Sequence, residues 1–301
     1  MKYLAGIVTF NPNIERLDQN IRAIYPQVSH IYIVDNGSKN KEEISQLVAD
    51  YNEEGHLTVD YLTENKGIAY ALNCIGQFAV AQEFDWFLTL DQDSVVLGDL
   101  IDNYENYLHL PKVGMLSCLY QDMNRENLVM QEFDYKEIEE CITSAALMKT
   151  SVFEETSGFA EEMFIDFVDS EMNYRLSEMG YKTYQVNFIG LLHEIGHSSR
   201  VKKFGHVFHV LNHSPFRKYY MIRNAIYIIK KYGKKKRYKY LVFMRNEFVR
   251  VLVAEEQKSK KIVAMIKGLK DGLLMKVDKY GKKGKNSCCF LRILSTLPRR
   301  Y

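Results

Sequence analysis

The stretch Trp86-Phe87-Leu88-Thr89-Leu90-Asp91-Gln92-Asp93-Ser94 decides the fold. Its first five residues form a mostly apolar run that predicts a short buried strand, and the polar run that follows marks the end of that strand. Three earlier segments, 3–9, 31–34 and 57–62, predict strands of the same kind, and the segments 17–25, 44–51 and 69–82 between them predict helices. Strands that alternate with helices predict right-handed crossovers and a mainly parallel sheet. The chain is therefore expected to have an α/β fold.

Polar residues follow three of the predicted strands, at 9–11, 35–38 and 91–94. Ligands of such sheets bind just outside the carboxyl ends of the strands, so we expect these residues to line one crevice. Asp91 and Asp93 stand two residues apart, and side chains at that spacing in an extended chain point to the same side. Two such carboxylates suit Mg²⁺ or Mn²⁺ that also binds a diphosphate, although a solvated turn is the alternative.

Two further segments have the features of a ligand-binding loop. In 35–38, Asn36-Gly37 favours a tight turn, and that turn can present a carboxylate to a nucleobase N–H. In 64–69, Gly67 lets a ligand approach the backbone, and the start of the following helix favours an anion.

The two parts of the chain differ strongly in charge. Residues 1–200 contain 13 Lys and Arg against 33 Asp and Glu, whereas residues 201–301 contain 27 against 5. The segments 216–232, 238–253 and 262–275 predict helices, so we divide the chain into a domain at 1–210 and a helical, basic region at 211–301. This asymmetry suggests a polyanionic or membrane partner for the basic region, with the densest run of cations at 230–239. The alternatives are a subunit interface and cations that merely balance the acidic part.

Other features of the sequence bear on the compartment. No apolar run approaches the roughly 20 residues of a membrane-spanning helix. The five cysteines show no CxxC spacing, and the first residues continue into a strand pattern without a signal-peptide cleavage site. We therefore expect a cytoplasmic protein.

Eight short motifs follow one another in a characteristic order over about residues 1–230. Together they resemble the bacterial rhamnosyltransferase branch of the family 2 inverting glycosyltransferases, which have the Rossmann-like GT-A fold. The motifs are VTFNP (8–12), VDNGS (34–38), ENKGIAYALN (64–73), DQDS (91–94), TSAAL (143–147), FIDFVDSEMNYRLSEMGY (164–181), HEIG (193–196) and HSPFRKYYMIRN (213–224).

The resemblance implies a reaction and its partners. It implies transfer of L-rhamnose from dTDP-rhamnose to a lipid-linked intermediate of a capsule, O-antigen or cell-wall polysaccharide, with Mg²⁺ or Mn²⁺, at the inner face of the cell membrane. UDP-galactofuranose or a UDP-hexose are alternative donors. A nucleic-acid-binding protein is an alternative of another class, but the acidic part would repel phosphate and the lysines lack regularly interleaved aromatic residues.

The resemblance also implies roles for individual residues. Thr9 and Asp35 match residues that line the base and ribose pocket, and residues 65–69 match the loop beneath the nucleotide. Asp91 matches the member of the acidic pair that lies near the ribose or binds the metal through water. Asp93 matches the direct metal ligand, and His193 matches a histidine that lies near the metal or the diphosphate. The full donor-binding set in the nucleotide domain is Thr9, Asn11, Asp35, Asn36, Gly37, Asn65, Lys66, Gly67, Ala69, Asp91, Gln92 and Asp93.

The catalytic base follows from the register of one motif. Inverting transfer is a single displacement, which needs a carboxylate to accept the proton of the acceptor hydroxyl. Many relatives carry a Glu-Asp pair with an arginine six residues after the aspartate. Arg175 sets this register and makes Asp169 the base, although Val168 replaces the glutamate and both Asp166 and Glu171 lie nearby. The alternative is that these acids merely favour the start of a helix.

A cluster of cations and aromatic residues lies in the predicted helix at 216–232. Helical spacing puts Arg217 and Tyr220 on one face, and Tyr219 and Arg223 on one face. We expect Arg217, Tyr219 and Arg223 to hold the leaving diphosphate or an acceptor phosphate. A helix that packs on the sheet with its cations reaching to solvent is the alternative.

Overall fold

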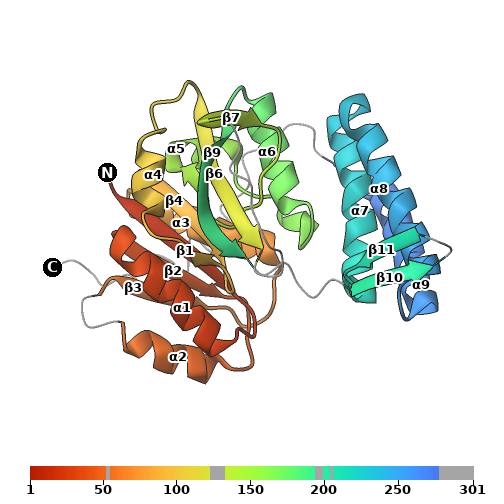
Figure 1. Cartoon of the computed structure of the whole chain (residues 1–301), viewed down its shortest axis with the longest axis horizontal. Coiled ribbons are helices and arrows are strands. Elements are labelled where there is room, and N and C mark those ends of the chain that lie inside the picture. Colours follow the sequence, from red (N-terminus) through yellow and green to blue (C-terminus); the bar gives the residue numbers. More distant parts are fainter. Residues whose placement is uncertain (52–54, 123–132, 194–198, 204–205, 278–301) are drawn as a thin grey trace.

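A computed structural model of the chain describes residues 1–51, 55–122, 133–193, 199–203 and 206–277 (Figure 1). Within these residues, nine strands form one sheet in the order β3-β2-β1-β4-β8-β6-β9-β5, with β7 paired to β9. The strands are β1 (Tyr3–Thr9), β2 (His30–Asp35), β3 (Leu57–Tyr61), β4 (Trp86–Asp91), β5 (Val95–Val96), β6 (Val113–Asp122), β7 (Tyr135–Ile138), β8 (Ala146–Lys149) and β9 (Lys182–His193).

The helices pack on both faces of the sheet. They are α1 (Ile14–Ile24), α2 (Lys41–Ala49), α3 (Ile68–Ala81), α4 (Leu100–Glu105), α5 (Thr150–Thr156) and α6 (Val168–Glu178). Alternate residues of β1 point to opposite faces of the sheet and pack in two hydrophobic clusters. Tyr3 belongs to the cluster with α1, α2 and α4, whereas Leu4 belongs to the cluster with α3, α5 and α6. Gly6 allows α3 to lie close to β1, because a Cβ there would come within 2.2 Å of Ile75.

The predicted parallel arrangement holds for only part of the sheet. β3, β2, β1 and β4 are parallel, as the alternation of strands and helices predicted. β8 runs antiparallel to both β4 and β6, and β5 and β7 run antiparallel to β9. β5, β7 and β8 have two to four residues each, which is too short for a period-two pattern to be recognised in the sequence.

Three helices form a bundle beside the sheet (Figure 1). They are α7 (Pro215–Tyr232), α8 (Lys234–Val253) and α9 (Lys258–Leu274), preceded by the hairpin β10 (Ser199–Lys203) and β11 (His206–Val210), which the sequence did not predict. The side-chain amide of Asn224 in α7 donates to the carbonyls of Met163, Ile165 and Asp166, at 2.8–2.9 Å. The bundle is thus attached to the segment that leads into α6. No helix in the described part of the chain is long and apolar enough to cross a bilayer.

Candidate active site

The sheet brings the three polar clusters together at one edge. β1 lies between β2 and β4, and the parallel register places Thr9 opposite Asp35 and Val8 opposite Asp91. Because these strands run in the same direction, the residues at their carboxyl ends lie side by side. The three polar clusters are therefore neighbours at the ends of β1, β2 and β4, and a ligand-binding crevice between them stays a prediction.

The Asp35 carboxylate is fully buried and holds the turn after β2. It accepts hydrogen bonds from the Thr9 hydroxyl (3.0 Å), from the Ser38 backbone N–H (3.0 Å) and from the Ser38 hydroxyl. The Asn11 backbone N–H donates to Ser38 Oγ (2.7 Å). Gly37 has φ of +82° and a Cβ there would lie 2.6 Å from the Glu64 carbonyl carbon, so this turn fits closely against the next loop. Contact of Asp35 with a nucleobase stays a prediction.

The loop at 64–67 is tied to that turn by amides. Asn36 donates from Nδ2 to Asn65 Oδ1 (3.1 Å), and the Lys66 backbone N–H donates to Asn36 Oδ1 (2.8 Å). Asn65 Oδ1 also accepts from the Gly67 N–H (2.9 Å). Gly67 has φ of +89°, and a Cβ there would come 2.7 Å from the ring and the carbonyl of Phe164. Glycine thus permits a close approach to Phe164. Ala69 is fully buried in α3, and its contact with a ligand stays a prediction.

The DQDS loop after β4 is bonded to Phe10, which follows β1, and to Arg16 of α1. Gln92 Oε1 accepts from the Phe10 backbone N–H (2.7 Å), and the Asp93 carbonyl accepts from Arg16 Nε (2.9 Å). Neither bond uses the Asp93 carboxylate, and Asp93 as a whole is half-exposed.

Asp91 is held from both sides of the sheet. Its carbonyl accepts from the Asn20 amide (2.8 Å), and its N–H donates to Ser144 Oγ (3.2 Å). Ser144 belongs to the TSAAL motif, and its hydroxyl also donates to Ser94 Oγ (2.7 Å). The DQDS and TSAAL motifs, far apart in the sequence, therefore form one structure.

His193 lies at the end of β9, next to the same loop. Val95 pairs with Leu192 in antiparallel register, and one further step along that register places His193 opposite Ser94. The side chain of His193 lies outside the described part of the structure. Among the described side chains, no three His, Cys, Asp or Glu groups gather as a metal-binding cluster. Metal binding by Asp93 and His193 stays a prediction.

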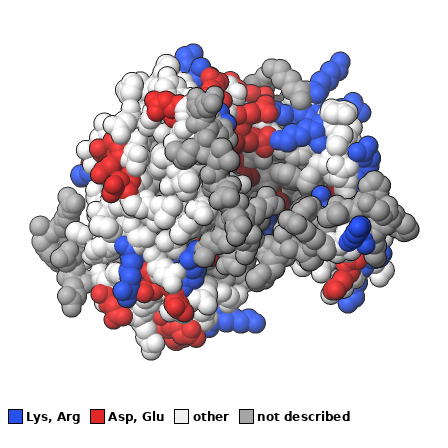
Figure 2. Space-filling model, viewed as in Figure 1, with Lys and Arg blue, Asp and Glu red and all other residues white. Residues whose placement is uncertain are grey.

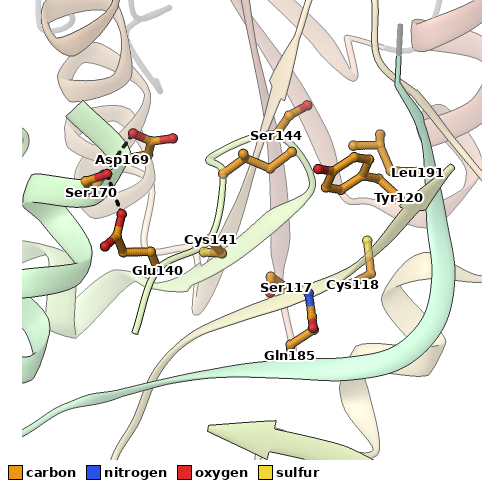
Figure 3. Close-up of a pocket in the computed structure, with 11 residues that line it drawn as sticks. Ser117, Cys118, Tyr120, Glu140, Cys141, Ser144, Asp169, Ser170, Gln185 and Leu191 are labelled. Carbon is orange, nitrogen blue, oxygen red and sulfur yellow. Dashed lines mark hydrogen bonds between the residues drawn. The ribbon is translucent and has the colours of Figure 1, made fainter. Parts of the chain in front are cut away.

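A cavity of about 250 Å³ lies at the first turn of α6 (Figure 3). Its walls come from β6, β9, the segment before β8 and the first turn of α6, which contributes Asp169. Ser144 lines it too, so the cavity reaches the residue that is bonded to Asp91. The lining residues are Ser117, Cys118, Tyr120, Glu140, Cys141, Ile142, Ser144, Asp169, Ser170, Gln185 and Leu191.

Burial of the carboxyl raises the pKa of Asp169 to about 6, and the negative charges of Glu140 and Asp91 add to the shift. One oxygen of Asp169 accepts from the Ser170 N–H (2.8 Å), while the Ser170 hydroxyl donates to Glu140 (2.8 Å). Figure 3 shows both carboxyl groups against Ser170. A carboxylate with this pKa is ionised at neutral pH and is also a better proton acceptor than an exposed aspartate.

The two other acids of this segment are engaged elsewhere. Asp166 pairs with Arg217 (3.0 Å). Glu171 is fully buried and pairs with Arg175 and Lys231, both at 2.6 Å. Burial raises the pKa of Glu171, but the two cations more than offset this and hold it below its usual value. Of the three acids, Asp169 is the one that lines the cavity.

The structure separates the members of the cluster in α7. Arg217 lies beside the segment that contacts Gly67, and its side chain remains 42% exposed. The Tyr219 hydroxyl donates to Asp271 of α9 (2.9 Å), and Arg223 donates to the carbonyl of Glu162 and stacks on the Tyr220 ring at 4.5 Å. Tyr219 and Arg223 therefore have packing roles between elements, and phosphate binding by this cluster stays a prediction.

Sequence reasoning missed Glu140 and Lys239. Glu140 accepts from Ser170, Tyr174 and Lys239, and Lys239 comes from α8, 99 residues away. Burial raises the pKa of Glu140, but these hydrogen bonds more than offset it and hold the pKa below its usual value. The position of Glu140, three residues before the TSAAL motif, was the available signal.

Comparison with known proteins agrees with this geometry. Residues 5–116 match the model of glycosyl transferase family 2. The chain is 27% identical to the dTDP-rhamnosyl transferase RfbF of Shigella flexneri over 243 residues, which cover 75% of this chain and 79% of that protein.

Two solved structures share the fold. The structure of GalNAc-T7 with UDP, GalNAc and Mn²⁺ has a TM-score of 0.61 at 13% identity and covers 91% of this chain and 56% of that one. The mannosyltransferase PcManGT of Pyrobaculum calidifontis, solved with GDP-Man and Mn²⁺, has a TM-score of 0.52 at 15% identity and covers 91% of this chain and 73% of that one. The family match lies on strands β1 to β5 and the start of β6, and the likeness of fold extends over most of the chain, so the chain contains a glycosyl transferase family 2 domain at residues 5–116 and has the GT-A fold.

Proposed function

We propose that the chain is an inverting rhamnosyltransferase that transfers L-rhamnose from dTDP-rhamnose to a lipid-linked intermediate of a bacterial surface polysaccharide. The name of the Shigella flexneri relative supports this donor. The observation that carries the reaction is the cavity that holds Asp169 and reaches Ser144, which is hydrogen-bonded to Asp91 at the end of β4. UDP-galactofuranose and the UDP-hexoses are the alternative donors.

Asp169 is the proposed base. It accepts the proton of the acceptor hydroxyl while that oxygen forms its bond to the anomeric carbon. The bond from the anomeric carbon to the diphosphate oxygen breaks at the same time, and its electron pair leaves with the diphosphate. A single displacement of this kind inverts the anomeric centre.

The turn after β2 and the loop before α3 are the proposed nucleotide pocket. The amide bonds between Asn36, Asn65 and Lys66 hold the two segments in one arrangement, which supports a preformed site for base and ribose. Arg217, with its exposed guanidinium, is the member of the α7 cluster that we propose for the leaving diphosphate.

The end of β4 also suits a divalent cation. The carboxylates of Asp91 and Asp93 are half-exposed hard oxygen donors, and a diphosphate and water would complete the coordination that Mg²⁺ or Mn²⁺ requires. Asp93, with His193 at the adjacent strand end, would hold the cation, which neutralises charge on the leaving diphosphate when bound. Mn²⁺ in both similar solved structures supports this proposal.

The proposed acceptor defines where the enzyme works. A lipid-linked acceptor lies at the inner face of the cell membrane, so we propose a cytoplasmic, peripheral enzyme. In this arrangement residues 1–210 bind the donor and perform transfer, and residues 211–301 contact the acceptor, the membrane or a second copy.

A panel of nucleotide sugars tests the donor. The purified enzyme is incubated with Mn²⁺ and each of dTDP-rhamnose, UDP-galactofuranose and several UDP-hexoses, and release of the nucleoside diphosphate is measured. We expect the fastest release from dTDP-rhamnose. Faster release from a UDP-sugar would overturn the donor, and absence of release from every donor, with and without added glycan acceptor, would overturn the proposed reaction.

The pH profile tests Asp169 together with Glu140. Because the base acts only when deprotonated, transfer is expected to rise with pH through the pKa of Asp169, at about 6. Glu140→Gln removes a neighbouring negative charge that raises this pKa, so the rise should move to lower pH. The glutamine oxygen can still accept from the Ser170 hydroxyl, which keeps the contact on the side of Asp169, whereas the bonds from Tyr174 and Lys239 to the other carboxylate oxygen are lost.

Glu139→Gln is the matched control. Glu139 is one residue away, is exposed and pairs with Lys236, so its replacement removes the same charge without touching Ser170. We expect an unchanged profile for Glu139→Gln. An unchanged profile for Glu140→Gln as well would show that Glu140 has no electrostatic influence on the base.

A further inference from the structure

The outward face of α9 carries four strongly exposed apolar side chains. They belong to Val263, Ile266, Leu273 and Leu274, which are 67%, 56%, 60% and 71% exposed. Their spacing of three, ten and eleven residues from the first places them on one side of the helix. Contiguous exposed apolar surface of this kind is typical of an interaction site.

The opposite face of α9 is packed very closely on α7. A Cβ at Gly268 would lie 2.4 Å from the Tyr219 carbonyl oxygen, and one at Gly272 would lie 2.9 Å from the Arg223 carbonyl oxygen. Lys230 of α7 also donates to the carbonyls at the end of α9, including that of Leu273 (2.9 Å). The apolar face is therefore presented by a helix that is fixed in the bundle.

The exposed charges of α9 around this apolar face are positive. Lys260 and Lys270 are exposed on α9, and the single carboxylate of the helix, Asp271, accepts a hydrogen bond from Tyr219 of α7. The neighbouring helix α8 repeats the pattern, because its single carboxylate, Glu247, is buried against Lys218 (2.6 Å). Further exposed apolar residues of α8 are Tyr238, Leu241, Val249 and Leu252.

We propose that α9, assisted by α8, docks the enzyme on the surface of an anionic lipid bilayer. Apolar side chains enter the boundary between headgroups and acyl chains, and the surrounding lysines pair with anionic headgroups. A second copy of the chain is the less suitable occupant, because self-association through this face would bring lysines against lysines. Figure 2 shows blue side chains over much of the bundle, with one red patch at its lower end.

The structure changes which cations are available for this contact. The sequence singled out the run at 230–239, but Lys236 pairs with Glu139 and lies over the Tyr174 ring at 3.8 Å, and Lys239 pairs with Glu140. These lysines hold α8 against the catalytic domain. Lys234 and Arg237 of the run stay exposed on α8, so they can assist the outward lysines of α9 in the proposed membrane contact.

Vesicle co-sedimentation of the full chain tests the proposal. The probes are vesicles of pure phosphatidylcholine and vesicles of an equimolar mixture of phosphatidylcholine and phosphatidylglycerol, each at low and high salt. We expect sedimentation only with the anionic vesicles, and less of it at high salt. Both Lys260→Glu/Lys270→Glu and Leu273→Ser/Leu274→Ser should abolish it, because charge and apolar burial are each required.

Lys41→Glu/Lys112→Glu is the matched control, since these exposed lysines carry the same charge on the catalytic domain. It should sediment as the unaltered chain does. Equal binding to neutral vesicles, loss of binding in the control, or no binding at low salt would overturn the proposal. A dimer in solution that Leu273→Ser/Leu274→Ser dissociates, without vesicle binding, would assign the face to self-association instead. Release of dTDP from a soluble donor should be unchanged in the α9 variants, so failure of docking is distinguishable from failure of the proposed reaction.

Discussion

Asp169→Asn is expected to lower glycosyl transfer by about 10²- to 10⁴-fold, which is the usual contribution of a general base. The asparagine amide cannot accept the proton of the acceptor hydroxyl. Its oxygen can still accept from the Ser170 N–H, so the start of α6 should keep its geometry. Affinity for the donor, measured by calorimetry with dTDP in Mn²⁺, should therefore stay close to that of the unaltered enzyme. Transfer is measured as product formed at saturating donor.

Asp166→Asn is the matched comparison for the base. Asp166 lies three residues earlier, and its carboxylate is paired with Arg217. Its replacement weakens that pair and is expected to reduce transfer far less than Asp169→Asn does. If Asp166→Asn abolishes transfer while Asp169→Asn retains it, the base has been assigned to the wrong residue.

Asp93→Ala should abolish the part of the affinity for dTDP that depends on the divalent cation. Its carboxylate is the proposed anchor of the cation at the end of β4, and the cation links the protein to the diphosphate. The backbone of the loop should persist, because Arg16 binds the Asp93 carbonyl rather than its side chain. Titration of dTDP in the presence and absence of Mn²⁺ measures the effect directly.

Asp102→Ala controls for the loss of one negative charge. Asp102 is exposed on α4, and its replacement should leave the gain in dTDP affinity on adding Mn²⁺ unchanged. Retention of that gain in Asp93→Ala would exclude Asp93 as the anchor. Transfer by Asp93→Ala should also fall, since the leaving diphosphate loses its neutralising charge.

The half of the fold that forms the crevice could be predicted from local patterns. Strands β1, β2 and β4 are buried runs of six or seven residues that end in polar residues, β3 is a half-buried strand of five residues, and each of the four is separated from the next by a helix. Such patterns depend on neighbours within one element, and the rules for parallel crossovers then fix the arrangement of the strands. The convergence of Thr9, Asp35 and Asp91 follows from these rules alone.

The second half of the sheet could not be predicted in the same way. β8 pairs antiparallel with both β4 and β6, and this pairing brings Ser144 to Asp91. A strand of four residues acquires its stability from its partners rather than from its own propensity. Its place is therefore decided by contacts between residues that are 31 to 63 positions apart.

The sequence by itself determined the reaction class and the candidate acids, because both reside in short motifs whose residues are neighbours in the chain. The register set by Arg175 already selected Asp169 as the candidate base, but only the tertiary structure showed how the surroundings of the nearby acids differ: Glu171 pairs with Lys231 of α7, whereas Asp169 lines a cavity. The same holds for the basic region, where the sequence determined an excess of cations. The fold decided which of these cations pair with the catalytic domain and which face outward. Charge is a property of each residue, but exposure and pairing depend on the residues that the fold places beside it.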